Sequence, residues 1–112
     1  MIIEISSDAL IDLEEGFDFY QRQSQGLGAY FISCLMTDIE ALTYFGGIHQ
    51  VVNGYHRALS KRFPFCIYYD IKGEILTVVA VLVMLAEILS GYGRDWADQS
   101  AGPIAMASKR FR

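Results

Sequence analysis

Residues 65–82 read FCIYYDIKGEILTVVAVL. β-Branched and aromatic residues fill both halves of this stretch, and Lys72-Gly73 between them is a turn signal. The stretch therefore predicts two paired antiparallel strands, over residues 65–71 and 74–82. Because side chains alternate along a strand, Tyr68 and Tyr69 should point to opposite faces of the sheet. We expect one ring in the core and the other free to cover or receive a partner.

The residues just before this stretch also have a strand pattern. Residues 48–52 are rich in β-branched side chains, and Asn53-Gly54 is a strong hairpin turn signal. Residues 55–62 alternate and place Arg57, Leu59 and Lys61 on one face. Pro64 cannot donate to a central ladder, so we expect it at a strand start or a bulge.

Gly46-Gly47 separates two patterns of apolar residues. Before these glycines the apolar residues recur every three or four positions, as in a helix, and after them they alternate, as in a strand. Residues 9–23 and 29–44 each carry an apolar stripe, formed in turn by Leu10, Leu13, Phe17 and Tyr20, and by Phe31, Leu35, Ile39 and Leu42. Ser6 or Ser7 can cap the first helix. The acids of that helix fall largely between the stripe positions and are expected on a solvated face: Asp12, Glu14, Glu15 and Asp18.

The expected fold is of the α+β class. An N-terminal strand over residues 1–5 precedes two helices, which the short turn Gly26-Leu27-Gly28 folds into an antiparallel hairpin. A three- to four-stranded antiparallel sheet follows, with the helices packed on one of its faces. The residues expected to contribute most of the core are Leu13, Phe17, Phe31, Leu35, Ile67, Tyr69, Val79 and Val81.

Length and composition predict one globular domain in a reducing cytoplasm. The chain has 112 residues, of which 53% are hydrophobic, and a formal net charge of -4. Cys34 and Cys66 are far apart in apolar surroundings, which favours buried free thiols over a disulfide or a zinc site. No signal peptide opens the chain. The apolar run over residues 75–89 is shorter than the roughly 20 residues of a membrane span and contains Glu87.

The middle of the chain holds a small group of polar residues that could act on a phosphate. Arg57, Lys61 and Arg62 could stabilise negative charge, while His56 or Tyr55 could transfer a proton. The competing interpretation, which we favour, makes Arg57 and Lys61 ordinary surface residues and pairs Arg62 with an acid of the helical hairpin. The negative net charge also argues against a nuclease that binds the ribosome.

The two histidines, His49 and His56, do not have metal-ligand spacing with other residues. We therefore expect them to be structural or surface residues, and we expect no metal and no cofactor.

Several of these motifs, taken in order, resemble the RelE/ParE superfamily of toxins from type II toxin–antitoxin (plasmid stabilisation) systems, and most of all its ParE-like branch. The resemblance covers residues 1–82. It is carried by ALIDL (9–13) with FDFY (17–20), GLG (26–28) with Phe31, GYHRAL (54–59), RFPF (62–65), IYY (67–69) and the strand over residues 75–82.

This resemblance implies a cytoplasmic toxin that a cognate antitoxin neutralises, through an antitoxin segment that folds on contact. ParE-like toxins poison DNA gyrase, whereas RelE-like toxins cut messenger RNA in the ribosome. A non-enzymatic inhibitor is the favoured expectation, and a non-toxic binding module is the third alternative. The groove between the helical hairpin and the exposed sheet face is the expected antitoxin site, and Tyr55, Arg57 and Tyr68 are the candidate partner-binding residues.

Residues 83–112 depart from the family pattern. Family members continue with a charged segment similar to Asp-x-Arg-Arg-Asn-Pro, whereas this chain continues with the apolar VMLAEIL (83–89). Codons for residues 84–89 can be read in a neighbouring frame as Asp-Ala-Arg-Arg-Asn-Pro, which suggests a frameshift. The tail is therefore expected to be partly helical or disordered, and to weaken any toxin activity.

Overall fold

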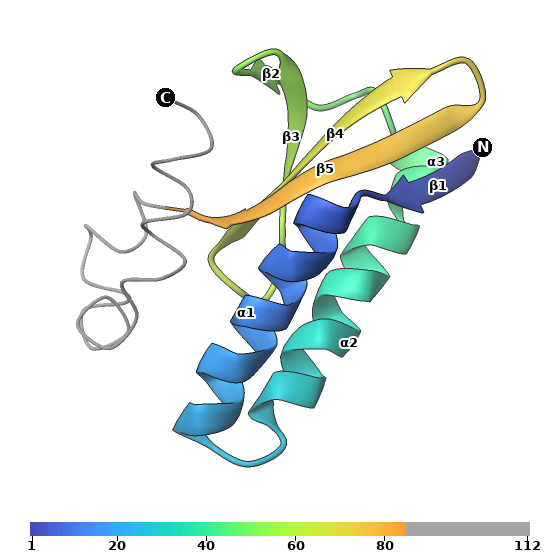
Figure 1. Cartoon of the computed structure of the whole chain (residues 1–112). Helices are drawn as coiled ribbons and strands as arrows, with labels where there is room; N and C mark the ends of the chain where they lie inside the picture. Colours follow the sequence, from blue (N-terminus) through green and yellow to red (C-terminus); the bar gives the residue numbers. More distant parts are fainter. Residues whose placement is uncertain (85–112) are drawn as a thin grey trace.

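A computed structural model of the chain describes residues 1–84. Two long helices cover one face of a twisted sheet, and no described helix covers the other face (Figure 1). In chain order the elements are β1 (Ile2–Ile5), α1 (Ser7–Gln23), α2 (Leu27–Glu40), α3 (Leu42–Phe45), β2 (Val51–Val52), β3 (Tyr55–Leu59), β4 (Phe65–Lys72) and β5 (Ile75–Val83). This is the predicted α+β architecture.

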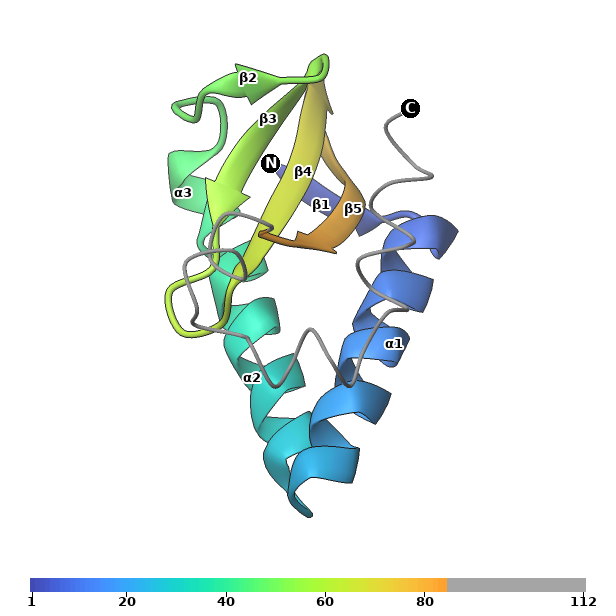
Figure 2. The same ribbon diagram turned by 90° about the vertical axis from the view of Figure 1, so that its left-hand side faces the viewer.

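The sheet has five strands in the order β1-β5-β4-β3-β2. Strands β2 to β5 form the predicted antiparallel meander, in which β4 and β5 are the longest pair. The N-terminal strand β1 lies parallel to β5 at the outer edge, with Ile2 beside Ile75. The described part of the chain therefore starts and ends on neighbouring strands. The hairpin α1–α2, which follows β1, lies on one side of the sheet (Figure 2).

The helical hairpin forms largely as its sequence predicts. Ser6 caps α1, because its Oγ accepts a hydrogen bond from the Ala9 N–H at 3.1 Å. In the turn, the Gln21 side chain accepts from the N–H groups of Gly26 and Gly28. The second helix is shorter than expected, since α2 ends at Glu40 and the separate turn α3 follows.

Aromatic rings fill the space between the hairpin and the sheet. The ring of Phe31 is fully buried and lies 5.0–5.1 Å from those of Tyr20, Phe63 and Phe65. Gly16 lies against the same ring, where a Cβ would come within 2.5 Å of it. The two helices can therefore approach closely only because this position has no side chain.

Most of the predicted core is confirmed, since Leu13, Phe31, Leu35, Ile67, Tyr69 and Val81 are all buried. The prediction was wrong for Phe17 and Val79, which are only partly buried. Leu10, which was expected in the apolar stripe of α1, is 49% exposed. Phe17 and Leu10 instead line a groove between the helices. Val79 is the extra residue of a β-bulge, because Tyr68 pairs with Ala80 and Tyr69 with Val78.

Asp12 was expected on the solvated face of α1, and this prediction was wrong. Only 4% of its surface is exposed, and its Oδ2 accepts a hydrogen bond from the Val81 N–H at 2.9 Å. Pairing with β1 ends at Val78, so the next residues of β5 lack a neighbouring strand on that side. Side chains at and near the start of α1 bond to this part of the β5 backbone instead. Besides the contact of Asp12, the Ser6 Oγ donates to the Val79 carbonyl at 3.3 Å.

Two strands are shorter than their sequence pattern suggests. Residues 48–50 precede β2 instead of belonging to it, and β3 ends at Leu59. Lys61 was expected on the alternating strand, but it lies in the connection between β3 and β4. The predicted turn at Asn53-Gly54 is confirmed, since both residues have positive φ. Pro64 directly precedes the first residue of β4, as expected.

Replacement of Phe31 by alanine should lower the free energy of unfolding by about 2–5 kcal/mol, because it removes the ring at the centre of the aromatic cluster. The neighbouring Tyr30→Ala is the matched control, since Tyr30 is 47% exposed. Urea denaturation followed by circular dichroism measures both changes. Equal small losses would contradict the described packing.

Replacement of Asp12 by alanine should destabilise the chain by about 1–3 kcal/mol, because it leaves the Val81 N–H buried without its acceptor. Asp12→Asn keeps a side-chain oxygen at this position and should lose less. The comparison of the two variants in urea separates the hydrogen bond from the loss of the side chain. A loss for alanine no larger than that for asparagine would show that the hydrogen bond contributes little.

Candidate functional site

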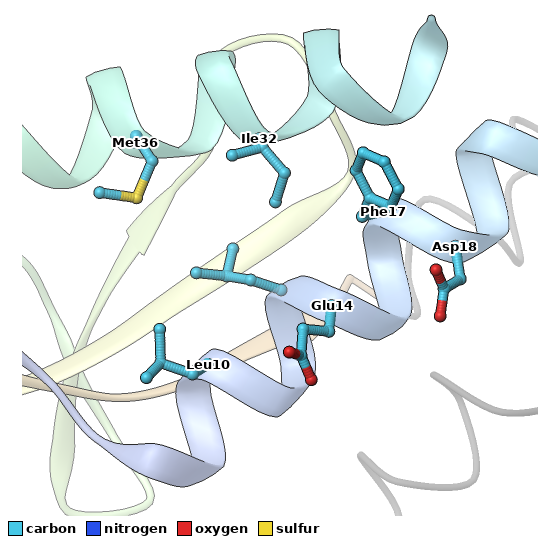
Figure 3. A pocket seen from close by; sticks show the side chains of 7 residues that line it. Leu10, Glu14, Phe17, Asp18, Ile32 and Met36 are labelled. Atoms are coloured by element: carbon cyan, nitrogen blue, oxygen red, sulfur yellow. The ribbon is translucent and has the colours of Figure 1, made fainter. Parts of the chain in front are cut away.

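A groove lies between the two long helices. It has a volume of about 710 Å³ and is lined by Leu10, Leu13, Glu14, Phe17, Asp18, Ile32 and Met36. Figure 3 shows Ile32 and Met36 extending from α2 towards α1, whose Glu14 and Asp18 add two carboxylates. An apolar floor with acids on one side suits an amphipathic segment that carries basic residues.

The face of the sheet opposite the helices carries the three predicted partner-binding residues. Tyr55 and Arg57 project from β3, and Arg57 lies opposite Tyr68 of β4. Tyr68 belongs to a second apolar cluster with Cys66, Ala80 and Leu82, against which Tyr55 packs. The structure therefore brings the three together on one face, but Tyr68 is only 8% exposed and offers little contact surface.

Burial controls the acid–base behaviour of this second cluster. It raises the pKa of the Tyr68 hydroxyl and that of the Cys66 thiol above their ordinary values. The nearby Arg57 guanidinium acts in the opposite direction on the pKa of both groups. Neither side chain is therefore activated as a nucleophile or a base, and both cysteines are free thiols, as expected.

His56 lies on the other face of β3 from Arg57. Its ring stacks on Tyr69 with centroids 5.0 Å apart, and its Nδ1 donates to the His49 carbonyl at 2.8 Å. The Nδ1 of His49 lies 2.5 Å from the Tyr69 hydroxyl, which also accepts a hydrogen bond from the Gly47 N–H. Both histidines therefore hold the segment before β2 on the sheet.

Lys61 and Arg62 lie in the connection between β3 and β4. Contacts of the residues before and after them hold this connection against the helices. Asp38 of α2 accepts hydrogen bonds from the Ser60 hydroxyl at 2.7 Å and from the Lys61 N–H at 3.2 Å. The next aromatic residue, Phe63, enters the core cluster. Both basic side chains are exposed, and within residues 1–84 Arg62 does not form the ion pair that we considered for it.

The candidate catalytic residues are thus not brought to one place. His56 and Arg57 point to opposite faces, and Lys61 and Arg62 follow after the end of the strand. Among the described residues, no three His, Cys, Asp or Glu side chains are arranged to hold a metal ion. In the same part of the chain, no helix is long and apolar enough to cross a membrane.

Comparison with known proteins gives a likeness of fold. No protein family and no curated protein matches the chain. Among solved structures, one chain described as "Chromosomal ParDE TA system from P. aeruginosa" is similar, with a TM-score of 0.65 and 17% sequence identity. The match covers 72% of this chain and 92% of the other. The expected RelE/ParE-like fold is therefore confirmed.

The sequence did not point to the histidine–tyrosine cluster or to the role of Asp38. The hydrogen-bond partners of Tyr69 are 20 to 22 residues away along the chain, and Asp38 is 22 residues from Ser60. No local period links such pairs. A usable signal was the pair His49 and His56 on either side of a hairpin turn, since paired strands bring the residues around such a turn close together.

The pKa of His49 should lie below its ordinary value of 6.5, because burial disfavours the charged ring and a charge on His56 disfavours it further. The folded chain then binds fewer protons than the unfolded chain as the pH falls through 6.5. The contribution of His49 to stability is therefore complete above that pH and is lost as the pH falls.

An NMR titration of the ring protons tests this prediction. In His56→Gln the pKa of His49 should rise part of the way towards 6.5, because burial, the larger cause, remains. A His49 pKa at or above 6.5 in the unmodified chain would show that the ring is well solvated.

Proposed function

We propose that this chain is the toxin component of a ParE-type toxin–antitoxin system and that it acts by binding proteins. The observation that carries the proposal is the acid-lined apolar groove between α1 and α2, on a fold similar to that of a chain from a ParDE TA system. A toxin of this kind requires a surface on which an antitoxin can fold and hold it inactive.

The chemistry of the groove specifies the antitoxin segment. Its apolar lining comes from both helices, so a partner helix lying between them would bury an apolar stripe along its length. Glu14 and Asp18 lie one turn apart on α1, and both are exposed. We infer that the segment carries lysine or arginine at a similar spacing. The proposed antitoxin site is therefore on the helical side of the sheet and differs from the face that carries Tyr55, Arg57 and Tyr68.

The arrangement of His56 and Arg57 supports a binding function better than it supports RNA cleavage. A ribonuclease needs its proton-transfer group and its cationic groups around one phosphate. Here the ring of His56 is occupied by Tyr69 and a backbone carbonyl, and Arg57 is on the opposite face. The net charge of -4 would also repel the phosphates of RNA. The inhibitor function of ParE-like toxins, with DNA gyrase as the target, is therefore preferred.

The residues that follow Met84 bear on how active the toxin is. The predicted frameshift over residues 83–89, and the tail up to residue 112, lie almost entirely outside the described residues. Of that segment the structure describes Val83, which completes β5, and Met84, whose N–H donates to the Pro64 carbonyl. We propose that loss of the family's two arginines at this end of the sheet weakens the toxin, since fixed positive charge next to its target surface is removed.

Charge reversal in the groove tests the proposed antitoxin site. The antitoxin for this test is the product of any small open reading frame found beside the gene. The double variant Glu14→Lys/Asp18→Lys should bind it at least about tenfold more weakly, a change of about 1.4 kcal/mol. Isothermal titration calorimetry measures this affinity. Charge repulsion with the basic segment is the expected cause.

The matched control is Glu40→Lys/Glu74→Lys, which makes the same change in net charge on exposed acids outside the groove. It should retain the affinity of the unmodified chain. Equal affinities of both double variants would move the antitoxin away from this groove, and absence of binding by the unmodified chain would contradict the proposed function itself.

A further inference from the structure

A second surface of the molecule is apolar and lies on a different part of the fold from the groove. Residues 44–51 run from the last two residues of α3 to the first residue of β2 and contain four exposed large hydrophobic side chains. Tyr44 is 84% exposed and Ile48 is 74% exposed, while Phe45 and Val51 are each more than half exposed. Exposed apolar side chains grouped in this way are typical of interaction sites.

The same part of the chain carries no formal charge. Between Glu40 and Arg57 there is no Asp, Glu, Lys or Arg, although the chain as a whole has a net charge of -4. Two copies of this chain repel one another over most of their surface, because both are negative. They can approach with least repulsion where neither presents a charge, which is along this segment.

Residues 44–51 are held firmly in spite of their exposure. The buried Tyr69 hydroxyl accepts a hydrogen bond from the Gly47 N–H at 2.9 Å and lies beside the His49 ring. The His49 carbonyl accepts from His56 of β3. Since the backbone is already fixed on both sides of Ile48, an interface formed here would not require the segment to become ordered first.

Among residues 1–84, no strand pairs with the outer edge of β2, the strand that ends this segment. β2 is the last strand of the sheet and contains only Val51 and Val52, which pair with β3 on one side. Figure 2 shows α3 and β2 on the opposite side of the molecule from α1. An antiparallel pair of such edges, one from each of two copies, satisfies two-fold symmetry because each copy contributes the same residues.

We propose that residues 44–51 form a symmetric interface between two copies of this chain, with Tyr44, Phe45 and Ile48 as its apolar anchors and the outer edge of β2 beside them. A basic antitoxin segment is not the occupant that this surface fits. The groove offers Glu14 and Asp18 to such a partner, whereas residues 44–51 offer no carboxylate. The interface would leave the groove of each copy free.

Sedimentation equilibrium of the full-length chain tests the proposal. Protein concentrations up to about 1 mM make a dimer with a dissociation constant of about 1 mM detectable. The unmodified chain should form dimers. In Tyr44→Lys/Ile48→Lys the dimer dissociation constant should rise at least about tenfold, because each copy then brings two positive charges to the interface.

The matched control is Ile11→Lys/Tyr30→Lys, which adds the same charge at two exposed apolar positions of the helical hairpin. It should dimerise like the unmodified chain. A monomeric unmodified chain would overturn the proposal. So would an equal weakening in both double variants, since that would show a general effect of charge, and so would unchanged dimers in Tyr44→Lys/Ile48→Lys. Thermal unfolding of each variant confirms that the comparison is made between folded proteins.

Discussion

The hydrogen bond from the Val81 N–H to the buried carboxylate of Asp12 connects the helical layer to the sheet. It acts where β1 stops pairing with β5 and where a bulge turns Val79 away from the core. Without Asp12, the Val81 N–H would be buried without an acceptor, at a cost of about 1–3 kcal/mol. Because Asp12 satisfies it, α1 can lie directly against β5. The second helix packs against α1 where the Phe31 ring lies on Gly16. The groove lies between the two helices positioned in this way.

The elements with a clear period were predictable, and the contacts between elements were not. The stripe from Phe31 to Leu42 and the strands around Lys72-Gly73 follow from local patterns, because burial of one face imposes the period. Asp12 was misplaced because an acid on a helix has the same appearance in sequence whether it meets water or a backbone N–H. The bulge at Val79 and the anchor from Asp38 to Ser60 likewise depend on residues distant in sequence.

In the candidate site, too, some features follow from local sequence patterns and others do not. The candidate partner-binding residues Tyr55, Arg57 and Tyr68 lie on one face of the sheet, because side chains alternate along each strand. It also grouped His56 with Arg57 as a possible phosphate site, although neighbouring residues on a strand point to opposite faces. Within residues 1–84, one apolar surface lies between the helices beside two acids, and another, without formal charge, lies before β2. This difference in charge is the reason why we propose a different partner for each surface.

Growth of a host that lacks the antitoxin is the most direct measure of the proposed toxin function. Two versions are compared under one inducible promoter: the chain as it stands, and a version in which the Asp-Ala-Arg-Arg-Asn-Pro frame is restored after Leu82. The account predicts that the restored version arrests growth, that co-expression of the antitoxin relieves the arrest, and that the present chain has a weaker effect or none. If neither version slows growth although both accumulate in folded form, the chain is not a toxin and the proposed function is wrong.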